Sequence, residues 1–169
     1  MLRVAGVDGY LPSMRHHLRI ATLAFAITAS TAAAAQEAEL PYWASIDAEE
    51  AYMRSGPAMQ FPIVWVYKRD GLPVRVVRLI QGWRYVEEPD GTMGWISSGL
   101  LSRQRTAIVT GEDLVPMRAE PSESGELRWK LEAGVVGNLG ECSDGWCEFD
   151  VEDHMGWVEE ANLWGAGEP

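Results

Sequence analysis

Two stretches of the chain have the residue pattern of β-strands. Residues 63–67 and 74–80 are rich in β-branched and aromatic side chains, which favour extended backbone. Turn residues rich in glycine, aspartate and proline stand at 81–82, 89–91 and 143–145. Short strands at regular spacing with turns between them predict a small all-β barrel or sandwich.

The chain repeats itself at an offset of about 63 residues. Met53-Arg54-Ser55-Gly56-Pro57 matches Met117-Arg118-Ala119-Glu120-Pro121, and Trp65 matches Trp129. Further on, Gly82-Trp83 matches Gly145-Trp146, and Gly94-Trp95 matches Gly156-Trp157. The order is kept with only two single-residue gaps. We therefore predict two tandem copies, at 47–108 and 109–169, with the matched positions of the second ending near 165.

The four repeated tryptophans have a structural interpretation. A unit of about 60 residues buries little surface, so large aromatic side chains help its core. Each buried indole removes on the order of 200 Å² from water. We therefore expect Trp83, Trp95, Trp146 and Trp157 to pack in the cores.

The first copy resembles a bacterial SH3-like domain. The resemblance is carried by Arg54-Ser55-Gly56-Pro57, by Gly71, by Gly82-Trp83-Arg84-Tyr85-Val86, and by Asp90-Gly91 followed by Gly94-Trp95. Residues 65–69 and 103–107 also resemble a subgroup found in exported proteins of alphaproteobacteria. The second copy departs from this pattern, with Glu120 in place of the opening glycine and His154 at the position of Gly91. The resemblance implies two tandem small SH3-like β-barrels and a binding role in the cell envelope, often on peptidoglycan.

The first 35 residues have the order of a secretory signal peptide. A short basic segment from Met14 to Arg19 is followed by an apolar run of about ten residues and then by small residues up to Ala35. We interpret 1–35 as a signal peptide, with Met14 as the true initiator, and expect a periplasmic or secreted protein. Residues 36–46 belong to an acidic leader, expected to be flexible although Tyr42 and Trp43 have the character of docking residues. No apolar run has the roughly 18–20 residues of a transmembrane span.

The net charge of −11 is unevenly distributed. Residues 36–50 carry −5, residues 51–110 carry +4, and residues 111–169 carry −12. Overall acidity argues against nucleic acid, because phosphate binding needs clustered Lys and Arg. The basic first copy still leaves an anionic envelope polymer or an acidic partner open.

The two cysteines lie on either side of a tight turn. Cys142 and Cys147 replace Leu79 and Arg84 of the first copy, which are expected to face each other across a hairpin. An exported protein meets an oxidising compartment, so a disulfide is the leading interpretation. The alternatives are a metal site or a thiol nucleophile with His154, but such a Cys2His set lacks a fourth strong ligand.

The sequence contains no nucleophile elbow, zincin helix motif, P-loop or dinucleotide fingerprint. The carboxylates of the second copy, Glu148, Asp150, Glu152 and Asp153, alternate along the chain as on a solvated strand face. We therefore expect a non-enzyme with no catalytic residues, no metal and no cofactor.

The candidate ligand residues of the first copy are aromatic and basic. Strand alternation places Trp65, Tyr67 and Arg69 on one face, and Arg84 and Tyr85 follow on a later strand. Aromatic faces stack on sugars or peptides, and arginine pairs with carboxylates. The first hypothesis is a cell-envelope binding module for peptidoglycan or a periplasmic protein. The second is a structural or regulatory protein-interaction protein, and the third, the weakest, is an envelope hydrolase.

Overall fold

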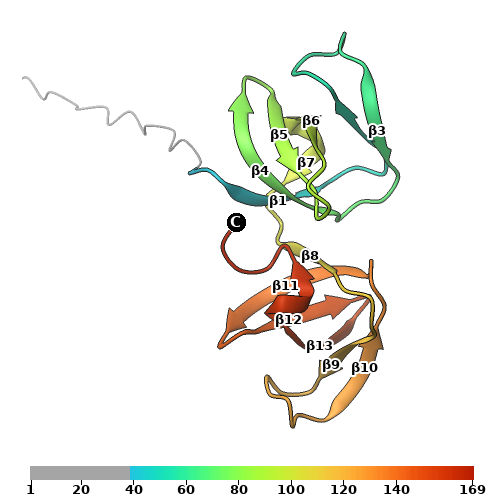
Figure 1. Cartoon of the computed structure of the whole chain (residues 1–169), viewed down its shortest axis with the longest axis vertical. Coiled ribbons are helices and arrows are strands. Elements are labelled where there is room, and N and C mark those ends of the chain that lie inside the picture. Colours follow the sequence, from blue (N-terminus) through green and yellow to red (C-terminus); the bar gives the residue numbers. More distant parts are fainter. Residues whose placement is uncertain (1–38) are drawn as a thin grey trace, which may run out of the picture. The chain divides into compact units, whose positions relative to one another are not determined.

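The computed structural model describes residues 39–169. The predicted signal peptide of 1–35 and the start at Met14 lie outside these residues. The described chain is all-β and forms two seven-stranded sheets, which we call the N-terminal module (42–102) and the C-terminal module (106–164) (Figure 1).

The N-terminal module holds seven strands and one short helical turn. They are β1 (Tyr42–Ile46), β2 (Ala51–Arg54), β3 (Ile63–Tyr67), β4 (Pro73–Ile80), β5 (Trp83–Glu87), β6 (Met93–Ser97), the 3-10 turn η1 (Ser98–Leu100) and β7 (Leu101–Ser102). The C-terminal module repeats the series with β8 (Thr106–Val109), β9 (Val115–Arg118), β10 (Leu127–Leu131), β11 (Val136–Ser143), β12 (Trp146–Val151), β13 (His154–Glu159), η2 (Glu160–Asn162) and β14 (Leu163–Trp164). Neither 3-10 turn, the only kind of helix among residues 39–169, has the length to cross a membrane.

The two sheets have the same strand order. It is β3-β2-β6-β5-β4-β1-β7 in the N-terminal module and β10-β9-β13-β12-β11-β8-β14 in the C-terminal module. Each strand of one module therefore has a counterpart in the other, and the internal repeat of the sequence corresponds to two copies of one fold.

The acidic leader is not a separate segment. Tyr42–Ile46, which the sequence analysis places in the leader, is strand β1 and pairs with both β4 and β7. Four of its five residues are buried. Its counterpart β8 begins at Thr106, before the boundary expected at 108/109. The sequence pattern misses this strand because five residues flanked by acids are too short a run to be recognised.

Each module encloses its own core. In the N-terminal module the core is formed by Ala44, Ile46, Ala51, Met53, Tyr67, Val74, Val76, Val86 and Ile96. In the C-terminal module it includes Val109, Met117, Leu139, Phe149 and Val158. Trp95 and Trp146 are buried as expected, whereas Trp83 and Trp157 are only partly buried. Aliphatic side chains and methionine, more than tryptophan, therefore fill the interior.

The repeated glycines have two different backbone roles. Gly82 and Gly145 adopt φ values of 74° and 80° in the turns that precede β5 and β12, a region that favours glycine. Gly94 and Gly156 instead lie against the methionines of the crossing strand, where an added Cβ would collide with the side chain of Met53 or Met117. The two Gly-Trp pairs thus recur because the turn and the strand crossing recur.

The β12–β13 turn is one residue shorter than its counterpart. Val151 pairs with His154, so only Glu152 and Asp153 form the turn, both with positive φ. In the N-terminal module the Glu88 backbone N–H donates to the Thr92 carbonyl across residues 89–91. His154 therefore corresponds to Thr92, and not to Gly91 as expected from the repeat in the sequence.

The cysteines form the expected disulfide. Cys142 and Cys147 are bonded and face each other across the β11–β12 hairpin. Leu79 and Arg84 face each other at the same register of the β4–β5 hairpin. Since the chain has two cysteines, the bond removes both thiols from the metal and nucleophile alternatives.

Residues 39–169 belong to one compact unit that includes both modules. The indole of Trp43 on β1 meets Trp164 on β14 edge to face, with ring centroids 5.1 Å apart, and its Nε1 donates to the Gly167 carbonyl at 3.1 Å. Arg105, between the modules, donates to the Gly165 carbonyl at 2.8 Å. Strand β14 and the residues after it therefore contact β1 and hold the C-terminal module against the N-terminal one.

Candidate functional site

An apolar groove lies on the N-terminal module. Its volume is about 630 Å³, within the range typical of small-ligand sites. It runs between β3 and the β5–β6 turn. We call it the Trp65 groove, and it is lined by Met53, Ser55, Val64, Trp65, Glu88, Pro89, Asp90, Thr92 and Met93.

A β-bulge shapes one wall of the groove. The β2–β3 register pairs Met53 with Trp65 and Arg54 with Ile63, which leaves Val64 without a partner. A bulge re-aims the side chains beside it, so the consecutive residues Val64 and Trp65 both line the groove. Trp65 is 58 % exposed, an unusual position for an indole in a small domain.

The opposite wall carries two carboxylates. Burial raises the pKa of Glu88, the neighbouring Tyr67 hydroxyl opposes that rise, and the charge of Asp90 adds to it. The Thr92 backbone N–H donates to Asp90 Oδ1 at 2.8 Å and lowers the pKa of that carboxyl. The groove thus combines an exposed aromatic face with an acidic side.

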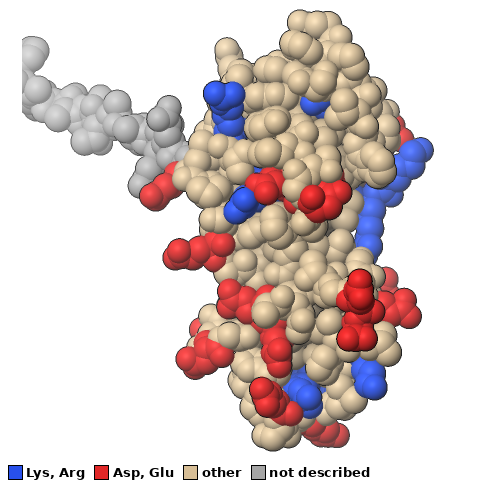
Figure 2. All heavy atoms as spheres, viewed as in Figure 1, with Lys and Arg blue, Asp and Glu red and all other residues tan. Residues whose placement is uncertain are grey.

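The surface around the groove is apolar. Residues 55–66 contain no charged residue, and Met59, Phe61, Ile63 and Val66 are between 38 % and 70 % exposed. Figure 2 shows this part of the molecule, over β3 and the loop before it, with almost no charged side chains. The counterpart segment 119–130 holds five charged residues. This contrast was the sequence signal that would have located the site.

The equivalent groove of the C-terminal module is bridged by its own side chains. Arg128 replaces Val64 at the bulge, and its Nη1 donates to the Met155 carbonyl at 3.0 Å. His154 packs edge-on against Trp129, with ring centroids 5.2 Å apart. A smaller pocket of about 270 Å³ remains there, lined by Arg128, Glu148, Met155 and three others.

Of the five ligand residues expected from the sequence, only Trp65 lines the groove. Tyr67 is 4 % exposed and belongs to the core, where burial raises the pKa of its hydroxyl. Strand alternation alone put Tyr67 beside Trp65, but β3 is an edge strand whose last residue turns inward. Val64, Glu88 and Met93 were missed because they come together only through the bulge and the β5–β6 turn.

The other three expected residues make structural contacts elsewhere. Arg69 donates from Nη1 to the Gly134 carbonyl of the C-terminal module at 3.1 Å. Arg84 donates from Nε to the Tyr42 hydroxyl at 3.0 Å, and Tyr85 stacks at a tilt on Trp95, with centroids 4.9 Å apart. The structure does not gather these three side chains with Trp65 into one surface.

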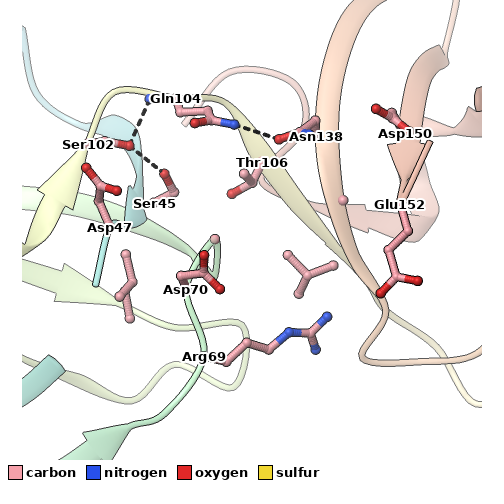
Figure 3. Close-up of a pocket in the computed structure, with 14 residues that line it drawn as sticks. Ser45, Asp47, Arg69, Asp70, Ser102, Gln104, Thr106, Asn138, Asp150 and Glu152 are labelled. Atoms are coloured by element: carbon pink, nitrogen blue, oxygen red, sulfur yellow. Dashed lines mark hydrogen bonds between the residues drawn. The ribbon is translucent and has the colours of Figure 1, made fainter. Parts of the chain in front are cut away.

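A second, polar pocket of about 450 Å³ lies between the two modules (Figure 3). Ser102 and Ser45 of the N-terminal module are hydrogen-bonded at 2.9 Å, and Gln104 Nε2, in the linker, donates to Asn138 Oδ1 of the C-terminal module at 2.7 Å. Asp47 and Asp70 face it from one side, and Asp150 and Glu152 from the other. Arg69, which also lines this pocket, donates to Gly134 of the C-terminal module, so the polar residues around the pocket help to hold the two modules together.

Comparison with solved structures finds remote likenesses. NlpC2 and NlpC1 from Trichomonas vaginalis are 13 % and 14 % identical, with TM-scores of 0.35 and 0.34 over 75 % and 77 % of this chain. An NlpC/P60 family protein from Bacillus cereus is 12 % identical, with a TM-score of 0.33 over 72 % of this chain. The alignments span 49 %, 48 % and 55 % of those three chains, about half of their length.

No curated protein matches the chain. The family model described as "Bacterial SH3 domain" matches it twice, at residues 47–103 and 111–165. These two ranges coincide with the two copies of the seven-stranded fold, apart from β1 and β8, which precede them. The chain therefore belongs to the bacterial SH3 domain family and carries two tandem copies of that domain.

Proposed function

We propose that this protein is a non-catalytic, exported binding module of the cell envelope, with peptidoglycan or a periplasmic protein as its ligand. The observation that carries the proposal is the contrast between the two grooves. In the N-terminal module the groove is open and surrounded by an uncharged surface, and in the C-terminal module Arg128 and His154 lie across it. The N-terminal module is thus the binding copy, and the C-terminal module supports it.

Several features support a binding role without catalysis. The family is one of binding domains. Glu88 and Asp90 lie on the same side of a shallow groove and do not flank a deep cleft as a glycosidase pair would. The disulfide fits the oxidising compartment of an exported protein.

A sedimentation experiment tests the proposal. Mature protein is spun with purified peptidoglycan, and Trp65→Ala is compared with Trp129→Ala as the matched control at the equivalent position. We expect wild type and Trp129→Ala to sediment alike and Trp65→Ala to lose at least tenfold in affinity, in line with the roughly 1–3 kcal/mol of an exposed aromatic contact. Equal sedimentation of all three proteins would exclude the groove as the peptidoglycan site.

The second candidate function is binding of a protein partner. It is favoured by the large apolar side chains Met59, Phe61 and Ile63 beside the groove, since exposed apolar patches of this kind typically mark protein contacts. A photo-crosslinking residue at position 65 or 129 distinguishes the two candidates in intact cells. A protein adduct formed from position 65 and absent from position 129 supports the protein partner, and the reverse pattern rejects it.

A further inference from the structure

The Trp65 groove has a definite charge character. Glu88 and Asp90 supply its acidic side, and no lysine or arginine is among the described residues that line it. Arg54 lies between the lining residues Met53 and Ser55 in the sequence. Its Nη1 donates to the Phe61 carbonyl in the β2–β3 loop at 2.8 Å. The nearby Lys68 pairs with Glu50 at 3.3 Å. The groove therefore complements a cation and disfavours an anion.

The C-terminal module carries its own cation across the equivalent groove. There the bulge residue is Arg128, and its guanidinium lies across the equivalent groove on the Met155 carbonyl. The pocket it lines also contains the carboxylate residue Glu148. The N-terminal module has Val64 at the bulge, so the corresponding place beside Met93 is left open.

We propose that the Trp65 groove binds a segment of a partner protein that presents a lysine ammonium flanked by large apolar side chains. The ammonium is placed at the Glu88 and Asp90 carboxylates, and the apolar lysine stem packs on the exposed Trp65 face. The apolar side chains that flank this lysine in the partner segment cover Met59, Phe61 and Ile63 of the N-terminal module. This inference rests on the proposed binding role of the same groove.

Two observations favour a protein segment over the peptidoglycan polymer. The surface beside the groove is built from large apolar side chains that glycan hydroxyls and small stem residues leave uncovered. Carboxylates of the polymer meet the like charges of Glu88 and Asp90, which costs binding energy. The raised pKa of Glu88, caused by burial, also means that an approaching cation stabilises a carboxylate that is poorly solvated.

The test uses the mature, oxidised protein and three capped fluorescent peptides. Their sequences are Val-Leu-Lys-Leu-Val, the same peptide with an acetylated lysine, and the same peptide with glutamate in place of lysine. Fluorescence anisotropy is expected to show binding of the lysine peptide, at least tenfold weaker binding of the acetyl-lysine peptide, and none of the glutamate peptide. Raising the salt concentration is expected to weaken binding of the lysine peptide more than binding of the acetyl-lysine peptide, because salt screens charge attraction.

Matched variants assign the binding to the acidic side of the groove. Glu88→Gln with Asp90→Asn is expected to lower affinity for the lysine peptide at least tenfold and to abolish the preference over acetyl-lysine. The Asp90→Asn change keeps a side-chain oxygen as acceptor for the Thr92 N–H, so the turn is preserved. Glu152→Gln with Asp153→Asn, at the equivalent turn of the C-terminal module, is expected to bind as wild type.

The outcomes separate this inference from the proposed function. If Trp65→Ala abolishes binding to peptidoglycan while acetylation of the lysine peptide changes nothing, the groove is the site and the cation preference is wrong. If the glutamate peptide binds as well as the lysine peptide, the preference is likewise overturned. If Trp65→Ala alters neither peptidoglycan nor peptide binding, the proposed function itself fails.

Discussion

Trp65 and Tyr67 are two residues apart on one strand, yet their side chains differ in solvent exposure. Trp65 is 58 % exposed at the groove, whereas Tyr67 is 4 % exposed in the core. The difference follows from β3 lying at the edge of the sheet, since its first four residues project past the core and only its last returns to it. An edge strand therefore offers side chains from both of its faces, and the bulge at Val64 selects which of them line the groove.

Glu88 connects the groove with the pH dependence of stability. Because burial raises its pKa above the ordinary value of 4.5, the folded state holds the proton more tightly than the unfolded chain. This favours folding below that ordinary value, and the contribution is lost as the pH rises through the raised pKa. Glu88→Gln removes the effect, so the stability of the variant relative to wild type should increase as the pH rises from 4.5 through the raised pKa of Glu88.

Urea unfolding at pH 4, 5, 6 and 7 measures this difference, with the exposed Glu123→Gln as control. The same Glu88→Gln change is expected to weaken ligand binding, so stability and binding should move in opposite directions. Loss of stability in Glu88→Gln at pH 7 would contradict the account of Glu88 as a carboxylate held in the groove for its ligand.

The equivalent hairpins of the two modules are stabilised in different ways. In the β4–β5 hairpin, Arg75 donates to Glu87 and Arg84 donates to the Tyr42 hydroxyl. In the β11–β12 hairpin, the disulfide stands at the register of Leu79 and Arg84. A covalent bond thus replaces side-chain packing in the module that has the larger excess of acidic residues.

Removal of the disulfide by Cys142→Ser with Cys147→Ser is expected to cost about 2 kcal/mol, the chain-entropy value for so short a loop. Differential scanning calorimetry measures the loss, and reduction of the wild type with dithiothreitol should reproduce it. Because Trp65 and Glu88 lie in the other module, affinity for the lysine peptide should be unchanged. A large fall in that affinity would show that the C-terminal module contributes to the groove.

At the scale of the whole molecule, the two domains are joined by aromatic and backbone contacts. Trp164 packs on Trp43, and the Arg75 guanidinium lies 5.8 Å from the centre of the Trp164 ring. Gly165 lies close to Pro73 of the N-terminal module, since a Cβ there would be 3.2 Å from the proline side chain. The modules are therefore expected to unfold as one unit.

Trp164→Ala removes the aromatic part of this joint. We expect a loss of about 2–3 kcal/mol, below the range for a fully buried tryptophan, and separation of thermal unfolding into two transitions. Trp129→Ala, another tryptophan of the same module but outside the joint, is the control and should leave a single transition. An unchanged melting profile for Trp164→Ala would show that the hydrogen bonds from Trp43 to Gly167 and from Arg69 to Gly134 suffice to hold the modules together.

The sequence by itself determined the strands at 63–67 and 74–80, the twofold repeat, the resemblance to bacterial SH3 domains and the pairing of Cys142 with Cys147. These follow from local patterns, because turn glycines, β-branched runs and repeated Gly-Trp pairs act over a few residues. Tertiary structure decided that Tyr42–Ile46 is a core strand, that Tyr67 is buried and that Glu88 faces Trp65. Those results depend on sheet edges, a bulge and contacts between strands distant in the chain, which no local pattern encodes.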